Sequence, residues 1–271
     1  MKIKKIISCL IILMMAPVSS GFAKSTVPSK IKEENVTYTV GNRNYKGFVA
    51  YDENLKGKRP GALVVHEWWG LTDYPKMRAR QLAELGYVAF AVDMFGDGKI
   101  ATNPTEAQAY TAPIYSDPQK SKLMLDVALS KIKEFKQTDP GNIVAIGYCF
   151  GGSVVLNYAN LGGDVKAVVS FHGGLKGVAA NKDLLKAKIL VCQGGSDKFV
   201  PEADRTMFKH QMDSIGASYT FITYPDAMHA FSNPEATELG KKFSLPLGYN
   251  KSADLNSWND MKRFFKSLEL K

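Results

Sequence analysis

A cysteine between two glycines is the residue in this sequence best suited to act as a nucleophile. The segment Gly147-Tyr148-Cys149-Phe150-Gly151-Gly152 follows an apolar, β-branched run (143–146) and precedes an apolar run with helical spacing (153–158). Glycines on either side let a strand and a helix form a very tight turn, from which the nucleophile projects. The N–H groups at the start of such a helix favour a thiolate or an oxyanion. The pattern predicts that Cys149 is an activated nucleophile; a buried cysteine in a structural glycine turn is the alternative.

A thiol nucleophile needs a base, and the base needs an acid to orient it. After a turn of this kind, the acid and then the histidine are expected in loops past the ends of later strands. Asp197 follows the strand-like run 189–192, and His229 follows the run 219–224. We therefore expect Asp197 to orient His229, and His229 to act as the general base for Cys149.

Four other residues are weaker candidates for these roles. His66 precedes the nucleophile, and His210 falls within a predicted helix. Asp226 stands three residues before His229 and is expected to shape that turn. His172 ends a strand-like run, so it stays open as an alternative base.

Two backbone N–H groups are expected to stabilise the oxyanion that forms when a nucleophile attacks a carbonyl. One is the N–H of Phe150, directly after the nucleophile, and the other comes from the loop after an earlier strand. The apolar run 62–65 ends in His66-Glu67-Trp68-Trp69-Gly70. The N–H of Trp68 is therefore the second candidate.

These residues lie in a chain in which short apolar runs alternate with longer amphipathic ones, a pattern that predicts parallel strands joined by helices. Strands are expected at 36–40 and 45–51, forming a hairpin around Gly41-Asn42, and at 62–65, 87–93, 143–147, 165–171, 189–192 and 219–224. Helices are expected at 73–85, 121–135, 151–160, 202–215 and 253–268. Residues 95–117 are expected to be an insertion with little regular structure.

The first 23 residues have the layout of a cleaved secretory signal peptide. Three lysines precede an apolar run (6–16), and Gly21-Phe22-Ala23 is a small-x-small cleavage site. The run is shorter than the roughly 18 residues that a membrane-spanning helix needs. We expect residues 24–271 to form a single exported domain, periplasmic or secreted, with no membrane association after cleavage.

The charge distribution argues against a nucleic-acid partner. Without residues 1–23 the formal charge falls from +9 to +6, and acidic and basic residues are mixed along the chain. No Lys/Arg-rich block with interleaved aromatic residues is present. The sequence has no metal-ligand spacing and no dinucleotide fingerprint, so we expect neither a metal nor an organic cofactor.

Two cysteines follow the signal, Cys149 and Cys192. In an oxidising compartment a pair often forms a disulfide. Cys192 lies within an apolar strand-like run and Cys149 within the glycine-rich turn. We expect two separate thiols, with a disulfide as the alternative.

The surrounding motifs resemble those of the dienelactone hydrolase family of α/β-hydrolases. In chain order they are His66-Glu67-Trp68-Trp69-Gly70, Asp93-Met94-Phe95-Gly96, Gly147-Tyr148-Cys149-Phe150-Gly151-Gly152, Gly194-x-x-Asp197 and His229-Ala230-Phe231. They follow the family's order and span almost the whole mature chain. The resemblance implies an α/β fold of the α/β-hydrolase type, with a mostly parallel central sheet and helices on both faces, and hydrolysis of an ester or lactone.

The resemblance also implies roles for individual residues. Cys149, Asp197 and His229 would form a catalytic triad, and Cys149 would form an acyl-thioenzyme with the substrate. Glu67 would hold the resting thiol and help to activate it when substrate binds. A nearby carboxylate disfavours a thiolate, which would protect the sulfur from oxidation. The alternative is that Glu67 is a structural acceptor for nearby N–H groups.

The sequence departs from the family at two arginines that bind a substrate carboxylate. Asp97 stands at the first position, with Lys99 nearby, and Asn233 stands at the second. Neither lysine nor asparagine can bind a carboxylate through two parallel N–H groups as arginine does, so the sequence does not predict the dienelactone itself as substrate. Trp69, Phe95 and Phe231 are expected to line an aromatic substrate pocket, with packing of the core as their alternative role.

The sequence thus predicts a hydrolase of small-molecule carboxylic esters or lactones, working as a monomer or small homo-oligomer. One alternative is a non-catalytic ligand-binding protein on a hydrolase scaffold, which would have no need for an activated thiol. A second alternative is a thiol redox protein, which would need Cys192 within disulfide reach of Cys149.

Overall fold

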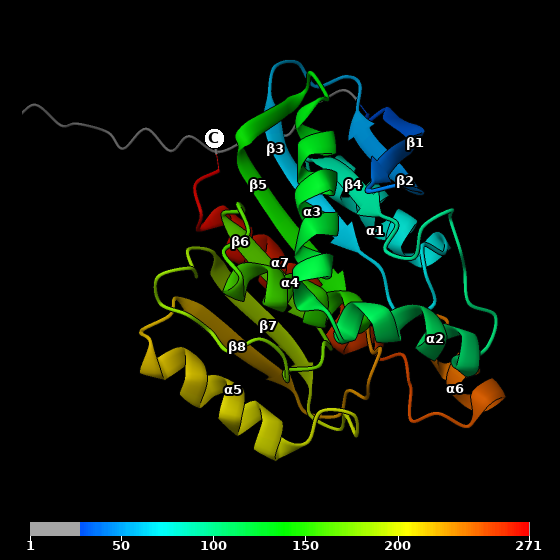
Figure 1. Ribbon diagram of the computed structural model, residues 1–271, viewed down its shortest axis with the longest axis vertical. Helices are drawn as coiled ribbons and strands as arrows, with labels where there is room; N and C mark the ends of the chain where they lie inside the picture. The colour runs from blue at the N-terminus through cyan, green and yellow to red at the C-terminus, as the bar shows by residue number, and fades with distance from the viewer. Residues whose placement is uncertain (1–27, 271) are drawn as a thin grey trace, which may run out of the picture.

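The computed structural model describes residues 28–270, so the predicted signal peptide lies outside the described residues. Within this range the strands are β1 (Ile31–Val40), β2 (Arg43–Asp52), β3 (Arg59–Val65), β4 (Val88–Val92), β5 (Thr138–Tyr148), β6 (Ala167–Phe171), β7 (Lys188–Gly194) and β8 (Tyr219–Tyr224). The helices are α1 (Asp73–Glu84), α2 (Pro104–Tyr115), α3 (Pro118–Lys133), α4 (Phe150–Asn160), α5 (Glu202–Ser214), α6 (Ala236–Phe243) and α7 (Lys251–Lys266). Figure 1 shows their arrangement.

The described strands form one sheet in the order β1-β2-β4-β3-β5-β6-β7-β8. The hairpin β1–β2 and the pair β2–β4 are antiparallel. From β4 to β8 every neighbouring pair is parallel. This confirms the predicted mostly parallel α/β fold. The carboxyl ends of the parallel strands meet at one edge of the sheet, where ligands bind in open α/β sheets.

Helices cover both faces of the sheet, as expected. The apolar side chains of α3, α4 and α5 pack on one face, and those of α1 and α7 pack on the other. Successive residues of a strand point to opposite faces, so strands that are covered on both sides are apolar throughout. β4 is such a strand, because all five of its residues are buried.

The expected helices and strands are all present, with bounds that differ by a few residues. The tight turn at Gly41-Asn42 joins β1 to β2. Asp73 begins α1 after the N-cap residue Thr72. Gly86, at φ +93°, follows the C-cap residue Leu85 and prevents the helix from continuing. The alternation of apolar runs therefore predicted the order and type of these elements correctly.

The expectation of little regular structure in residues 95–117 was wrong, because this segment contains α2. Pro104 occupies the first turn, where its missing N–H costs nothing. The side chain of Asn103 accepts from the Glu106 N–H at 3.0 Å, and Glu106 accepts from the Thr102 N–H at 2.8 Å. These two bonds resemble a capping box, with Glu106 reaching back one residue beyond the N-cap, and they start the helix.

α2 and the unpredicted α6 share a small apolar cluster that is separate from the two sheet faces. Trp69, Ala101 and Ala107 form its buried centre, and Leu239 and Phe243 of α6 pack against it. The cluster lies next to the carboxyl ends of the strands, because Trp69 follows β3 directly. Within residues 28–270, no helix combines the length and the apolar character needed to cross a membrane.

Candidate active site

The turn between β5 and α4 has the geometry that its glycines predicted. Cys149 adopts φ +52°, a region that L-residues seldom occupy. A Cβ at Gly147 would lie 2.0 Å from the Gly151 oxygen, and a Cβ at Gly151 would lie 2.3 Å from the Val65 oxygen. Only glycine fits at either position, so the two glycines allow the strand and helix to approach around the cysteine.

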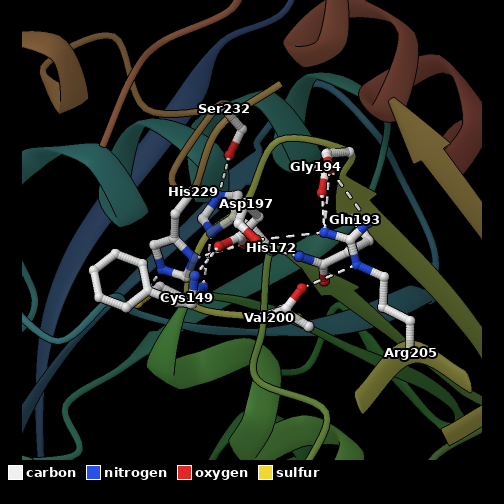
Figure 2. A network of polar contacts seen from close by, with 11 residues as sticks. Cys149, His172, Gln193, Gly194, Asp197, Val200, Arg205, His229 and Ser232 are labelled. Atoms are coloured by element: carbon white, nitrogen blue, oxygen red, sulfur yellow. Dashed lines mark hydrogen bonds and ion pairs between the residues drawn. The ribbon is translucent and has the colours of Figure 1, made fainter. Parts of the chain in front are cut away.

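The three side chains predicted to act together meet at this edge of the sheet (Figure 2). The Nε2 of His229 lies 3.0 Å from the Cys149 sulfur, and its Nδ1 lies 2.9 Å from Oδ2 of Asp197. Because a carboxylate only accepts hydrogen bonds, Nδ1 carries the proton and donates it to Asp197. Nε2 therefore faces the sulfur, where it can take the thiol proton.

Asp197 is held rigidly by several donors. Its Oδ2 also accepts from the Gln193 side chain at 2.8 Å, and its Oδ1 accepts from the Phe199 N–H at 2.8 Å. The loop around it is tied by Arg205, which donates to the carbonyl oxygens of Gly194 at 2.9 Å and Val200 at 3.0 Å (Figure 2). The carboxylate is thus fixed where it orients the imidazole.

The surroundings of His229 favour its protonated form. Burial alone would lower the pKa of His229, but the Cys149 sulfur and the Asp197 carboxylate outweigh it and raise the pKa to about 10. An imidazolium beside a sulfur anion is the ion pair that makes a cysteine reactive. The electrostatics therefore suit proton transfer from sulfur to imidazole.

Glu67 lies at the end of β3 and is 3% exposed. Its Oε2 accepts a hydrogen bond from the Asn233 amide at 2.6 Å. Burial raises the pKa of Glu67 to about 7, although Asn233 and His229 act in the opposite direction. In this structure the thiol contacts His229, and one oxygen of the Glu67 carboxyl contacts Asn233.

The two predicted oxyanion donors are Phe150, the first residue of α4, and Trp68, in the loop after β3. The Gly151 N–H donates to the His66 oxygen at 3.1 Å, which ties the nucleophile turn to the loop after β3. In the described part of the chain, the N–H groups of Phe150 and Trp68 make no backbone hydrogen bond. Neither of these two N–H groups is therefore committed to a backbone partner, as the predicted role requires.

The predicted pocket residues are buried. Phe231 is 0% exposed and packs against His172 and Tyr224. This burial favours the packing role that the sequence left open. Phe95 and Trp69 are also buried, at 4% and 7% exposure.

Two aromatic residues that the sequence analysis did not identify border the site instead. Tyr115 of α2 and Phe199 after β7 are 51% and 49% exposed. The Tyr115 ring lies 5.3 Å from that of Phe150, edge to face, and Phe150 directly follows Cys149. The Phe199 ring lies 4.9 Å from that of His229. Phe199 could have been found from its spacing of two residues from Asp197, whereas Tyr115 lies in the unpredicted helix.

The rival residues are engaged elsewhere. The Nε2 of His66 accepts from the Met94 N–H at 3.2 Å, and the Nδ1 of His172 accepts from the Cys149 N–H at 3.1 Å. His210 and Asp226 are exposed. His172 thus faces the backbone of the nucleophile, while His229 faces its sulfur.

Cys149 and Cys192 are both free thiols. Cys192 is fully buried and packs with the face of the sheet that α1 and α7 cover. The Tyr224 hydroxyl lies 3.6 Å from its sulfur, and burial raises the pKa of Cys192 to about 12. A buried neutral thiol is a packing residue and a poor partner in redox exchange.

The residues that stand in place of the two family arginines have other interaction partners. Asn233 binds Glu67, and Asp97 pairs with Arg43 on the surface at 3.3 Å. Lys99 lies over the ring of Tyr110. Among residues 28–270, no three His, Cys, Asp or Glu side chains gather in a way that could hold a metal ion.

Comparison with known proteins identifies the family. Residues 45–269 match the model of the dienelactone hydrolase family. The chain belongs to this family. Among curated relatives, "Putative carboxymethylenebutenolidase" of Methylorubrum extorquens is 31% identical over 65% of this chain and 64% of its own length. Protein usf of Aquifex pyrophilus is 26% identical over 82% of this chain and 92% of its own length.

Solved structures show the same relationship to dienelactone hydrolases. The dienelactone hydrolase-like promiscuous phosphotriesterase P91, from metagenomic libraries, superimposes with a TM-score of 0.83 and 30% identity, covering 88% of this chain and 98% of its own. A dienelactone hydrolase homologue from Klebsiella pneumoniae, at 21% identity and a TM-score of 0.75, shares the fold. The protein is a carboxylic ester hydrolase of this family.

Proposed function

We propose that the protein hydrolyses small uncharged esters or lactones by two-step acyl transfer through Cys149. The observation that carries this proposal is the continuous contact from sulfur to imidazole to carboxylate, at 3.0 Å and 2.9 Å. Such a chain is the arrangement that turns a thiol into a nucleophile.

In the first step His229 takes the proton from Cys149, and the sulfur attacks the substrate carbonyl. The N–H groups of Phe150 and Trp68 hold the oxyanion, and His229 returns the proton to the departing alkoxide as the carbon–oxygen bond breaks. In the second step His229 takes a proton from water, which attacks the thioester. The carbon–sulfur bond breaks, His229 returns this proton to the Cys149 sulfur, and the acid leaves. Asp197 keeps the imidazole in one tautomer throughout.

The substrate should be uncharged and should have an apolar or aromatic group beside the carbonyl. Tyr115 and Phe199 present half-exposed rings on either side of the Cys149–His229 pair. A substrate carboxylate would lie near the Glu67 carboxyl with no arginine at the position of Asn233 to compensate for its charge. Neutral esters avoid this unfavourable approach.

The two alternatives have less support. A binding module has no use for an imidazole aligned on a sulfur. A redox protein would need a second reactive thiol, and Cys192 is buried in the core on the other face of the sheet. We also propose export to the periplasm or beyond, on the basis of residues 1–23; protease accessibility of the protein in intact and permeabilised cells would test it.

The decisive experiment compares wild type, Cys149→Ala and Cys149→Ser on two matched substrates, a neutral aromatic nitrophenyl ester and the same ester carrying a carboxylate. We expect loss of turnover in both variants, preference for the neutral ester, and an acyl group on Cys149 detected by mass spectrometry of the quenched wild type. Full turnover by Cys149→Ala would eliminate the mechanism. Preference for the charged ester would eliminate the substrate assignment alone.

A further inference from the structure

A second histidine, His172, lies beneath the triad at the end of β6 and is fully buried. We propose that His172 is a positioning residue whose ring bridges the nucleophile turn and the His229 loop. The bridge fixes the distance between the Cys149 sulfur and Nε2 of His229. This inference rests on the proposed function, because it concerns the reactivity of the same thiol. None of the catalytic steps above uses His172.

The ring makes a hydrogen bond at each nitrogen, one to each loop (Figure 2). Its Nδ1 accepts from the Cys149 N–H at 3.1 Å, and its Nε2 lies 2.7 Å from Oγ of Ser232. A nitrogen that accepts from an N–H carries no proton, so the proton is on Nε2, which donates to Ser232. Ser232 follows His229 by three residues. The neutral ring therefore links the two segments that carry the reacting atoms.

The far end of this bridge is firmly anchored. The Ser232 hydroxyl also lies 2.7 Å from the Tyr74 hydroxyl, and the Ser232 carbonyl accepts from Arg78 at 2.7 Å. Arg78 is itself buried and paired with Asp254. α1 and α7 thus hold the His229 loop through Ser232, and His172 extends that support to the nucleophile.

The bridge also holds two unusual backbone conformations. His172 adopts φ +41°, and Cys149 adopts φ +52°. Non-glycine residues keep such angles only where their surroundings determine them. The Cys149 N–H is shared between the Phe171 oxygen at 3.0 Å and the His172 ring, and the His172 N–H donates to the Cys192 oxygen at 2.8 Å. Two non-glycine residues with positive φ are therefore bonded directly to each other at the nucleophile.

The same ring touches the catalytic imidazole. The ring centroids of His172 and His229 are 5.4 Å apart, and the two ring planes form an angle of 65°. The ring of Phe199 also contacts that of His229, with an interplanar angle of 66°. His172 therefore limits the tilt of His229, while Asp197 fixes its hydrogen bond. Reacting groups that must meet within about 3 Å lose much of their rate when misplaced by about 1 Å.

The groups around His172 keep it neutral. Burial, followed by the charges of His229 and Arg78, holds the pKa of His172 well below its usual 6.5. Tyr148, whose ring lies 6.0 Å from that of His172, and Tyr74, which also contacts Ser232, have pKa values that burial raises, so neither supplies a negative charge at neutral pH. The bridge therefore keeps its tautomer across the pH range in which the enzyme would work.

Three substitutions separate the two bonds. His172→Asn places an oxygen where Nδ1 stands, which keeps an acceptor for Cys149 and loses the bond to Ser232; asparagine also tolerates a positive φ. His172→Gln reaches the position of Nε2, which keeps the bond to Ser232 and loses the acceptor for Cys149. His172→Phe keeps a ring and loses both bonds.

The primary measurement is the rate of Cys149 alkylation by iodoacetamide against pH, with the modified peptide assigned by mass spectrometry. In this reaction the sulfur–carbon bond forms as iodide leaves. Its rate therefore measures the nucleophilic reactivity of Cys149 without requiring ester hydrolysis. Failure of the proposed function, seen as full esterase activity in Cys149→Ala, is therefore distinguishable from failure of this inference. kcat and KM for the neutral ester are measured in parallel.

We expect each His172 variant to lower the alkylation rate at neutral pH by about tenfold or more, with kcat falling and KM nearly unchanged. Ile132→Val, a core change in α3, is the control and should lower the melting temperature without changing alkylation. Wild-type alkylation profiles in the Gln and Phe variants would overturn the inference. If the Phe variant does not fold, Ser232→Ala takes its place: the same loss supports the bridge, and a wild-type profile overturns it.

Discussion

Replacement of Glu67 by glutamine should make the stability of the protein less sensitive to pH. Glu67 is buried, and burial raises the pKa from 4.5 to about 7. Between these values the folded state keeps a proton that the unfolded carboxyl has released, so the free energy of unfolding falls as the pH rises. A glutamine has no proton to lose, and its side-chain oxygen can still accept from Asn233.

The size of the effect follows from the two pKa values. At about 1.4 kcal/mol per pH unit, a carboxyl whose pKa moves from 4.5 to about 7 makes the folded state less stable by about 3 kcal/mol above pH 7 than below pH 4.5. Most of this change, between about 2 and 3 kcal/mol, falls between pH 5 and pH 8. Glu67→Gln should remove that part of the pH dependence.

Urea unfolding at pH 5 and pH 8 measures the quantity directly. The difference in unfolding free energy between the two pH values should be smaller in Glu67→Gln than in wild type by the amount above. Glu84→Gln, which changes an exposed acid at the end of α1, serves as the control and should keep the wild-type difference. An equal pH difference in Glu67→Gln and wild type would show that Glu67 titrates normally and that its burial has been misjudged.

Four further predictions concern the triad, its turn and the aromatic edge of the site. Asp197→Asn should lower kcat/KM by roughly 10³-fold or more, measured on a neutral ester, because the imidazole loses the acceptor that sets its tautomer. Cys149→Ala should bring the pKa of His229 down from about 10, followed by NMR titration, because the sulfur is one cause of its elevation. Phe199→Ala should raise KM for an aromatic ester several-fold and change kcat less. Gly151→Ala should yield no folded protein by circular dichroism, since its Cβ would lie 2.3 Å from a β3 carbonyl.

The sheet and the nucleophile turn could be predicted from the sequence because their causes are local. Runs such as 143–146 are apolar throughout because both faces of the strand are covered. Gly147 is required by a contact within the turn, and Gly151, which meets Val65 and His66, is already specified by its spacing of two residues from Cys149. The order of Cys149, Asp197 and His229 then followed from the positions of the loops after successive strands, and the structure brings the three together.

The helix in segment 95–117 was not predicted because the residues that indicate it lie at the ends of the helix. Pro104 and Pro113 lower the helix propensity of the segment, yet the first stands where a proline is tolerated and the second lies in the last turn. The Thr102–Asn103–Glu106 capping pattern was the local signal that could have revealed α2. Missing this helix also meant missing Tyr115 at the edge of the site.

The roles of the buried aromatic and imidazole rings depend on long-range packing. Phe231 follows His229 closely, but its side chain points into the core, which no spacing rule predicts. His172 contacts Ser232 across 60 positions of sequence. Contacts of this kind arise only when β6 and the loop after β8 are brought together by the folded sheet, so a single sequence could identify the residue but could not assign its partner.

The separate apolar cluster under α2 and α6 has a consequence for local unfolding. The cluster has three buried residues, and α2 adds only Ile114 to the main core, whereas α4 is buried along its whole length between the sheet and α3. Segments with few apolar contacts open at a lower free energy than the global unfolding of the domain. Backbone amides of α2 and α6 should therefore exchange with deuterium well before those of α4. α2, which carries Tyr115 at the edge of the site, would then be able to unfold and refold locally while the nucleophile turn stays in place.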